Sequence, residues 1–221
     1  GGVTVLMNSA VKRTLRLIQF VPADSPVALL IRHSARDEIP DGGTGMELPL
    51  NDLGIRLCQE LGRELVGRVR SARSSPVLRC VQTAELLGQA ADTDGEVILD
   101  KRLGAPGAYV LDEQLAWGNW LAHGNEGVIQ HLVSGAGALP GMADPAQAAN
   151  DLIEHLLACA GVEPGLHLFI SHDSIVTTTV ARAFGQDIPK SHWPEYLDAS
   201  AFWRQQNGRV VAYRDIVQDD L

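Results

Sequence analysis

Two short apolar runs in this chain each end in a polar cluster that contains a histidine. The first run, residues 27–31, reads Val-Ala-Leu-Leu-Ile and leads into Arg32 and His33. The second run, residues 166–170, leads through a serine into His172. Apolar runs of this length, bounded by polar residues, are typical of buried strands. In an open α/β sheet, ligands collect just beyond the carboxyl ends of such strands, so the residues that follow these runs are candidate ligand-binding residues.

A third segment of the same kind lies between these two. Residues 74–80 read Ser-Ser-Pro-Val-Leu-Arg-Cys, and Pro76 suits the first turn of a helix. Arg79 would then lie near a helix N-terminus, where backbone N–H groups favour anions. If the strands are parallel, the three junctions share one edge of the sheet, so their polar side chains are expected to converge.

The first junction has a composition that suits a phosphate. Arg32 and Arg36 flank His33, and each guanidinium can fork onto phosphate oxygens. Two fixed cations disfavour the charged form of an imidazole between them. His33 is therefore predicted to be a neutral nucleophile that attacks phosphorus.

Four segments, taken in order, resemble the histidine phosphatase superfamily, which includes phosphoglycerate mutases and histidine acid phosphatases. Arg32-His33-Ser34-Ala35-Arg36 is similar to the family's Arg-His-Gly box, with a serine in place of glycine. The other three segments are residues 49–54, residues 74–84 (Ser-Ser-Pro-x-x-Arg-x-x-Gln-Thr-Ala) and Ser171-His172-Asp173. Together they span most of residues 27–185. The resemblance implies a three-layer α/β/α sandwich with a mostly parallel central sheet and a small cap insertion.

The resemblance also implies a chemistry, which is phosphoryl transfer in two steps through a phosphohistidine. His33 would be the nucleophile, and Asp173 would protonate the leaving oxygen. The side chains expected to hold the phosphate oxygens are Arg32, Arg36, Arg79 and His172. This scheme requires neither a metal nor another cofactor.

The aspartate after the second histidine box indicates a branch of the superfamily. Asp173 favours the acid-phosphatase-like branch, because the mutase-like branch usually has glycine at that position. That branch typically has a large cap and several disulfides, whereas this chain has 221 residues and three cysteines. Any cap must therefore be small. The mutase-like branch supplies its proton donor from the start of the cap, which makes Asp100, Asp112 and Glu113 the alternatives to Asp173.

Length and pattern favour a single domain over residues 1–221, with a cap insertion at about residues 101–143. The cap region carries many glycines and little periodicity, and Trp117 and Trp120 in it are expected to pack more than to touch a ligand. Residues 41–45 are glycine-rich but lack the Gly-Lys-Ser/Thr of a phosphate loop, so we expect a plain linker.

Other elements follow from caps and periodicity. Asn51 is expected to cap a helix that runs to about Val69, with leucines along one face. Ser174 is expected to cap a helix that ends before Gly185, and Asn207-Gly208 indicates a hairpin. Further expected elements are a strand at residues 96–99, a helix at residues 144–159, a short helix or strand near residues 12–18, and hairpin strands at residues 201–204 and 210–213.

Composition excludes several classes of partner. The net charge of −9 argues against binding to nucleic acid or to an anionic membrane. No apolar run approaches the ~20 residues that cross a bilayer. The cysteines are odd in number, scattered and without metal-ligand spacing, so we expect free thiols in a reducing cytoplasm. The expected partner is a small phosphorylated substrate. The cysteines are Cys58, Cys80 and Cys159.

Other functions remain open at this point. The main prediction is a metal-independent phosphomonoesterase. A phosphoglycerate mutase-type phosphotransferase would use the same phosphohistidine but return the phosphoryl group to substrate. A metal-dependent phosphohydrolase needs further spaced His and Asp ligands, and sensitivity to chelators would identify it. A non-catalytic phosphate-ligand binding protein would release no phosphate from an aryl phosphate in the presence of a chelator.

Overall fold

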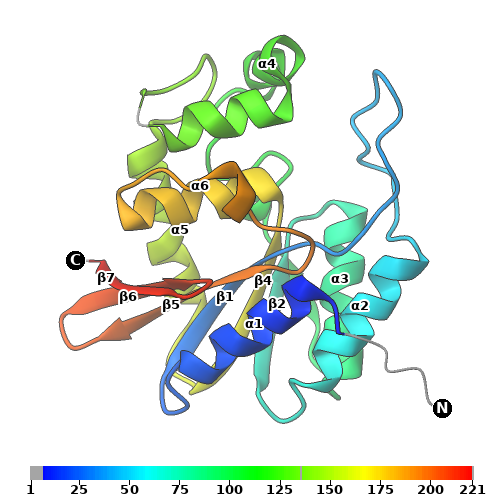
Figure 1. Ribbon diagram of the computed structural model, residues 1–221, viewed down its shortest axis with the longest axis vertical. Helices are drawn as coiled ribbons and strands as arrows, with labels where there is room; N and C mark the ends of the chain where they lie inside the picture. The colour runs from blue at the N-terminus through cyan, green and yellow to red at the C-terminus, as the bar shows by residue number, and fades with distance from the viewer. Residues whose placement is uncertain (1–6, 135, 221) are drawn as a thin grey trace.

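A seven-stranded sheet with helices on both faces forms the body of the protein (Figure 1). The computed structural model describes residues 7–134 and 136–220. Along the sheet the strand order is β3-β2-β4-β1-β5-β6-β7. The strands are β1 (Pro26–Arg32), β2 (Val69–Ser74), β3 (Val97–Leu99), β4 (Gly165–Ser171), β5 (Ala199–Gln205), β6 (Gly208–Tyr213) and β7 (Ile216–Asp220). The helices are α1 (Ser9–Phe20), α2 (Asp52–Arg63), α3 (Leu78–Ala90), α4 (Glu113–Val133), α5 (Pro145–Ala160) and α6 (Asp173–Phe184), with single 3₁₀ turns η1 (Lys101–Leu103) and η2 (Lys190–His192).

The first four strands are parallel, as the family resemblance implies. β1 pairs with β4 and β2 pairs with both β3 and β4, all in parallel register. Because these strands run in one direction, their carboxyl ends lie at one edge of the sheet. The expected α/β fold with a sheet that is parallel at its centre is confirmed.

The remaining three strands extend the sheet in antiparallel fashion. β5 pairs with β1, β6 with β5, and β7 with β6. The predicted hairpin is present, but its turn lies one residue earlier than Asn207-Gly208. Gln206 and Asn207 form the turn, Gly208 already pairs with Gln205, and Gln206 adopts a positive φ of 53°.

Two apolar clusters cover the two faces of the sheet, because successive strand residues point to opposite sides. Val27, Leu29 and Ile31 of β1 pack into a cluster with α1, α2 and α3. Ala28 and Leu30 pack into a second cluster with α4, α5 and α6. This alternation gives the three layers that the resemblance implies.

Helix boundaries differ from the expectations in a few places. Asn51 caps α2 through Gly54 N–H, but the helix ends at Arg63, and Val69 begins β2. His172, rather than Ser174, is the N-cap residue of α6. Pro76 lies outside α3, which begins at Leu78. The expected α5 is present with Asp144 as its cap, and the segment near residues 12–18 is helical within α1.

The region at residues 101–143 is more regular than its composition suggests. It contains α4, a 21-residue helical stretch that is kinked at Gly124, where φ is 70° and ψ is 169°. In Figure 1, α4 and the loop that follows β1 both lie at the end of the sheet where β1 ends. No helix in the described part of the chain is long and apolar enough to cross a membrane.

Candidate functional site

The three predicted junctions meet at the carboxyl edge of the sheet. His33 N–H donates to Ser171 O at 2.9 Å, which joins the end of β1 to the end of β4. Ser75 N–H donates to Ile170 O at 2.9 Å, which joins the end of β2 to the same strand. Local backbone pairing therefore places the polar residues that follow β1, β2 and β4 around one point.

His33 is buried and its ring is held in one tautomer. Its Nδ1 lies 2.8 Å from the Ser34 carbonyl oxygen, which can only accept a hydrogen bond, so Nδ1 carries the proton. Arg79 Nε donates to His33 Nε2 at 3.1 Å. Nε2 is therefore unprotonated, and its lone pair accepts the hydrogen bond from the arginine.

His172 faces His33 across the same point. The two ring centroids are 5.6 Å apart in an edge-on arrangement, and Ser75 Oγ lies 2.9 Å from His172 Nε2. Burial lowers the pKa of His33 well below its ordinary value, and the nearby His172 and Arg79 lower it further. Burial and then Arg79 lower the pKa of His172 to about 4. Both imidazoles are therefore neutral near pH 7.

Three guanidiniums surround the histidines, and two of them have unused donors. Arg32 Nη1 donates to Pro194 O at 2.9 Å, and its Cζ lies 4.4 Å from the centre of the Tyr196 ring. Within the described residues, Nε of Arg32 and Nε of Arg36 are buried without a hydrogen-bond partner. Because unpaired buried donors are costly, these N–H groups indicate a place for an anion.

Arg36 and Arg79 are otherwise held by backbone oxygens rather than by acidic side chains. Arg36 Nη1 donates to Asp37 O at 2.9 Å, and Arg79 Nη1 donates to Gly45 O at 2.7 Å. A local ion pair between Arg36 and the acidic residues that follow it is not formed. The positive charge of both guanidiniums is therefore not neutralised by these contacts.

The residue that replaces the family's glycine is accommodated by a hydrogen bond. Ser34 is fully buried, its Oγ donates to Gly54 O at 2.8 Å, and its N–H donates to Thr83 Oγ1 at 3.0 Å. Gly104 lies against His172 and Ser75. Only glycine fits at this position, because a Cβ there would lie 2.4 Å from His172 Nε2 and 2.4 Å from Ser75 Oγ.

Asp173 lies at the same site, where it begins α6. Its Oδ1 accepts from Ser174 N–H at 2.7 Å, its Oδ2 accepts from Asn125 Nδ2 at 2.9 Å, and Arg32 Nη2 lies 3.9 Å away. Asn125 is on α4, so this helix reaches the carboxylate directly.

The three alternative acids occupy different positions. Glu113 lines the same cavity as Asp173, and no hydrogen bond or ion pair holds its carboxylate within the described chain. Asp112 is instead the N-cap of α4, where it accepts from Leu115 N–H. Asp100 binds His155 and caps η1, and neither Asp100 nor Asp112 lines the cavity.

These groups open into a cavity of about 590 Å³. Its wall includes both tryptophans of α4, and Trp120 also packs against the apolar cluster of α4, α5 and α6, as expected. The glycine-rich segment at residues 41–45 is also more than a linker, because Gly43 and Thr44 line the cavity and Gly45 O binds Arg79.

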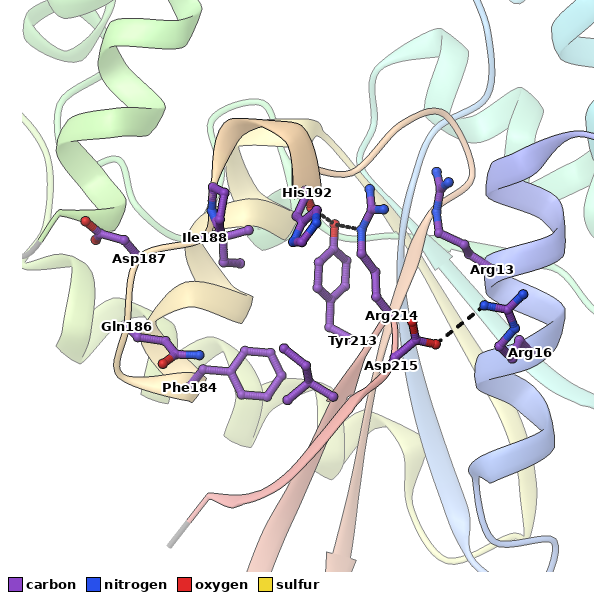
Figure 2. A pocket seen from close by; sticks show the side chains of 12 residues that line it. Arg13, Arg16, Phe184, Gln186, Asp187, Ile188, His192, Tyr213, Arg214 and Asp215 are labelled. Carbon is purple, nitrogen blue, oxygen red and sulfur yellow. Dashed lines mark hydrogen bonds and ion pairs between the residues drawn. The ribbon is translucent and has the colours of Figure 1, made fainter.

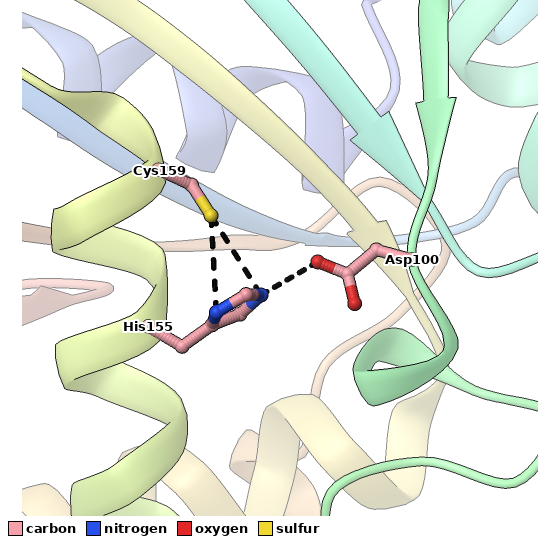
Figure 3. A group of neighbouring side chains, drawn as sticks. All are labelled: Asp100, His155 and Cys159. Atoms are coloured by element: carbon pink, nitrogen blue, oxygen red, sulfur yellow. Dashed lines mark hydrogen bonds and ion pairs between the residues drawn. The ribbon is translucent and has the colours of Figure 1, made fainter.

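A separate cluster at the end of β3 contains three potential metal ligands, Asp100, His155 and Cys159 (Figure 3). His155 Nε2 and Asp100 Oδ2 are 2.6 Å apart and bind each other, and Arg73 Nη1 lies 3.8 Å from the same oxygen. Cys159 Sγ is nearly equidistant from the two ring nitrogens, at 3.7 and 3.8 Å. The sulfur therefore lies over the ring rather than along a nitrogen lone pair, so this geometry does not suit a metal ion. All three cysteines are free, and Cys58 and Cys80 are buried.

A smaller hollow of about 210 Å³ lies between α1, η2 and the end of β6 (Figure 2). Its cations are already paired with carboxylates. Arg13 Nη2 lies 2.8 Å and Arg214 Nη2 3.7 Å from Asp198, and Arg16 Nη1 lies 3.5 Å from Asp215. The cations of this hollow are therefore less available to bind an anion than the cations of the first cavity.

Sequence reasoning did not identify four residues at the main site. Tyr196 precedes β5 and lies 5.8 Å from the His33 ring, between ring centres. Asn125 follows the kink of α4, and Ser75 and Gly104 contact His172. Ser75 belongs to the motif at residues 74–84 and could have been identified from it. Tyr196 and Asn125 lie in segments that have no recognisable sequence motif.

Comparisons with known proteins agree with this geometry. The model of the histidine phosphatase superfamily (branch 1) matches residues 28–203. Comparison with curated proteins gives no significant match. A phosphoserine phosphatase from Entamoeba histolytica superposes with a TM-score of 0.61 at 18% identity, covering 86% of this chain and 96% of that one. A putative alpha-ribazole-5'-P phosphatase from Escherichia coli gives 0.55 at 20% identity, with coverage of 86% and 96%. A mycobacterial glucosyl-3-phosphoglycerate phosphatase gives 0.53 at 17% identity, with coverage of 89% and 98%.

The match to branch 1 tests the assignment of the branch from Asp173. Asp173 alone favours the acid-phosphatase-like branch, but the matching model is that of branch 1. An aspartate after the second histidine therefore does not assign the branch.

Proposed function

Because the chain belongs to the histidine phosphatase superfamily, we propose that it is a phosphomonoesterase that forms a phosphohistidine on His33. The observation that carries the proposal is a neutral His33 ring with an unprotonated Nε2, beside guanidiniums that keep buried N–H donors without partners. A phosphate monoester supplies the anion that those donors need.

In the first step His33 Nε2 attacks phosphorus and the bond from phosphorus to the alcohol oxygen breaks. Arg79 gives up its hydrogen bond to Nε2 and turns to a phosphate oxygen. Arg32, Arg36 and His172 hold the other oxygens, where charge concentrates in the transition state. The Ser34 carbonyl stabilises the positive charge that the ring acquires, because it accepts from Nδ1–H.

In the second step water attacks the phosphohistidine, and His33 Nε2 leaves with its electron pair. The product is inorganic phosphate, and the neutral imidazole is restored. Three guanidiniums and the His172 ring supply the charge and the donors for both steps, so the scheme requires no metal ion.

Asp173 is our first choice for the proton donor to the leaving oxygen. Its position supports this role, since it is 28% exposed, lines the cavity and adjoins His172. Each carboxyl oxygen accepts one hydrogen bond and can take part in another, which leaves room for the transferred proton. In the second step the same carboxylate accepts a proton from the attacking water. Glu113 is the alternative.

We further propose that residues 101–143 form a cap over a single domain comprising residues 1–221. The cavity wall supports this division, because much of its outer part comes from this segment while the phosphate-binding groups come from the strand ends. The expected partner is therefore a small phosphorylated molecule that fits between the two.

The decisive experiment is covalent labelling with a chelator present. The wild-type protein should release phosphate from an aryl phosphate and trap an acid-labile, base-stable phosphoryl label. His33→Ala should lose both, whereas His123→Ala, an exposed change outside the cavity, should keep both. A folded His33→Ala protein that retains turnover would end the phosphohistidine proposal.

A further inference from the structure

The cavity has two chemically different ends. The inner end holds His33, His172 and the three arginines of the proposed phosphate site. We call the rest of the wall the outer end, and most of it comes from the loop after β1 and from residues 105–143. Its large apolar side chains include Ile39, Met46, Val110, Trp117, Trp120 and Met142.

No cation lines the outer end. All residues that line the cavity lie in the described part of the chain, and their arginines and histidines all belong to the inner cluster. The other charged side chains of the wall are Glu113 and Asp173, and both are acidic. A carboxylate or a second phosphate on the alcohol part of a substrate would therefore meet like charge without a counter-ion.

The aromatic wall is held in place from inside the site. Trp120 Nε1 donates to Asn125 Oδ1 at 3.1 Å, and Asn125 Nδ2 donates to Asp173 Oδ2 at 2.9 Å. This chain of hydrogen bonds links one indole to the carboxylate at the phosphate site. Trp117, three residues earlier on α4, is 41% exposed although it is large and apolar, so its face is available to a ligand.

We infer that the alcohol part of the substrate is uncharged, apolar and flat, as in an aryl or arylalkyl phosphate monoester. A cavity of about 590 Å³ accommodates one phosphate and such a group. We expect phosphorylated hydroxy acids and polyphosphates to be poor substrates, because the outer end of the cavity has no cation for their second anionic group. The inference rests on the proposed function, since it takes the inner cluster to be the phosphate site.

Three primary alkyl phosphates test this substrate class. 2-Phenylethyl phosphate, O-phosphoserine and 3-phosphoglycerate should be compared by kcat/KM at one pH. 2-Phenylethyl phosphate should be preferred over each of the others by about tenfold or more, the size of discrimination that one well-matched apolar contact gives. Equal values, or a preference for either hydroxy acid, would overturn the inference.

Two variants of α4 connect the preference to the proposed wall. Trp117→Ala should shrink the preference for 2-phenylethyl phosphate over O-phosphoserine by about five- to tenfold, because an aromatic contact is lost. Leu121→Ala is the matched control, since Leu121 lies on the same helix, is 70% exposed and does not line the cavity. It should leave the preference unchanged. An unaltered preference in Trp117→Ala would contradict the assignment of the wall.

A measurement on inorganic phosphate, which has no alcohol group, distinguishes failure of this inference from failure of the proposed function. Exchange of ¹⁸O between inorganic phosphate and water requires formation of the phosphohistidine from phosphate alone. Exchange together with a preference for a hydroxy acid would overturn the substrate class and leave the phosphatase proposal intact. Absence of both exchange and hydrolysis of every ester would overturn the phosphatase proposal, and the substrate class with it.

Discussion

The reactivity proposed for His33 depends on which ring nitrogen is free. Its Nδ1 is bound to the carbonyl of Ser34, so only Nε2 can attack. The serine leaves that carbonyl in place because its hydroxyl turns away to Gly54 O. Ser34, which replaces the family's usual glycine, is therefore compatible with the proposed chemistry, because its side chain packs away from the His33 ring.

Arg79→Ala should reduce kcat/KM on the order of 10²–10³, as removal of one preorganised donor does. Arg79 binds both His33 Nε2 and Gly45 O, so its loss removes a phosphate ligand and frees the loop at residues 41–45. Burial lowers the pKa of Arg79, which means that removing this cation also relieves a desolvation cost. The free energy of unfolding, measured in urea, should change less than the activation free energy.

The control for Arg79 is an arginine outside the cavity. Arg204→Ala removes an exposed ion pair with Glu154, and such pairs contribute about 0–1 kcal/mol. Its kcat/KM should equal that of the wild type. If Arg79→Ala behaved like Arg204→Ala, Arg79 would not contact the substrate.

Asp173→Asn and Glu113→Gln should separate the two candidate acids. Loss of the true proton donor should slow alkyl phosphates by about 10²–10⁴ in single-turnover experiments. Aryl phosphates with acidic phenols need little protonation, so their first step should suffer much less. We expect this difference in Asp173→Asn. The same difference in Glu113→Gln alone would move the role to the cap, and equal losses on both ester types would give Asp173 a positioning role.

At the scale of elements, the start of α2 supports the loop that carries Ser34 and Arg36. Asn51 caps the helix through Gly54 N–H, and Asn51 N–H donates to Ala35 O at 3.1 Å. Gly54 lies so close to this loop that a Cβ would be 2.1 Å from Ala35 O. The helix and the phosphate-binding loop therefore fit together only with glycine at this position.

Gly54→Ala should lower both stability and activity. The added methyl group meets backbone and not a flexible side chain, so the helix and the loop must separate, at a cost of about 1–3 kcal/mol. Gly118→Ala on α4 is the control, because Gly118 is helical and a Cβ there meets no atom within 4 Å. That change should stabilise the protein by about 0.5–1 kcal/mol. Urea unfolding and kcat/KM would measure both, and a Gly54→Ala protein with wild-type values would show that the contact is easily relieved.

The elements that could be predicted from sequence are those whose signal is local. The run that became β1 is apolar on both faces, the run that became β4 is apolar except for His167, and Asn51 and Asp144 are strong caps. α4 was not foreseen, because its glycines lower helix propensity and the kink at Gly124 interrupts the apolar periodicity. The end of α2 was placed too late because Leu65 continues the apolar face after the helix itself has ended.

At the scale of the whole molecule, the candidate site lies where the two halves of the fold meet. The parallel strands bring His33, Ser75 and His172 together, and this convergence follows from sequence once parallel strands are assumed. Tyr196 and Asn125 arrive from the antiparallel half and from α4, so their contribution depends on the tertiary fold. The convergence of the polar side chains at the strand ends could therefore be predicted, whereas the end proposed to select the alcohol could not.

Burial of two neutral histidines should make the stability of the whole protein sensitive to acid. The pKa of His172 is lowered to about 4, while a histidine in the unfolded chain titrates near ~6.5. Between these values the unfolded state binds a proton that the folded state does not, so the free energy of unfolding falls as pH falls through this window. Above about pH 6.5 this contribution is constant, and His33, whose pKa is also lowered, acts in the same direction.

Urea unfolding of the wild-type protein and of His172→Gln, at several pH values from 7 to 4, should show this effect. The wild type should lose about 3 kcal/mol more than the variant over the window, since each unit of pKa difference corresponds to ~1.4 kcal/mol. Glutamine can keep the hydrogen bond to Ser75 Oγ and does not titrate, so it removes the proton linkage while preserving the contact. Carboxylates that pair with arginines, such as Asp198 with Arg13, are present in both proteins and cancel in the difference. Parallel pH profiles would mean that burial does not lower the pKa of His172 in the folded protein, and the acid sensitivity argued here would then be wrong.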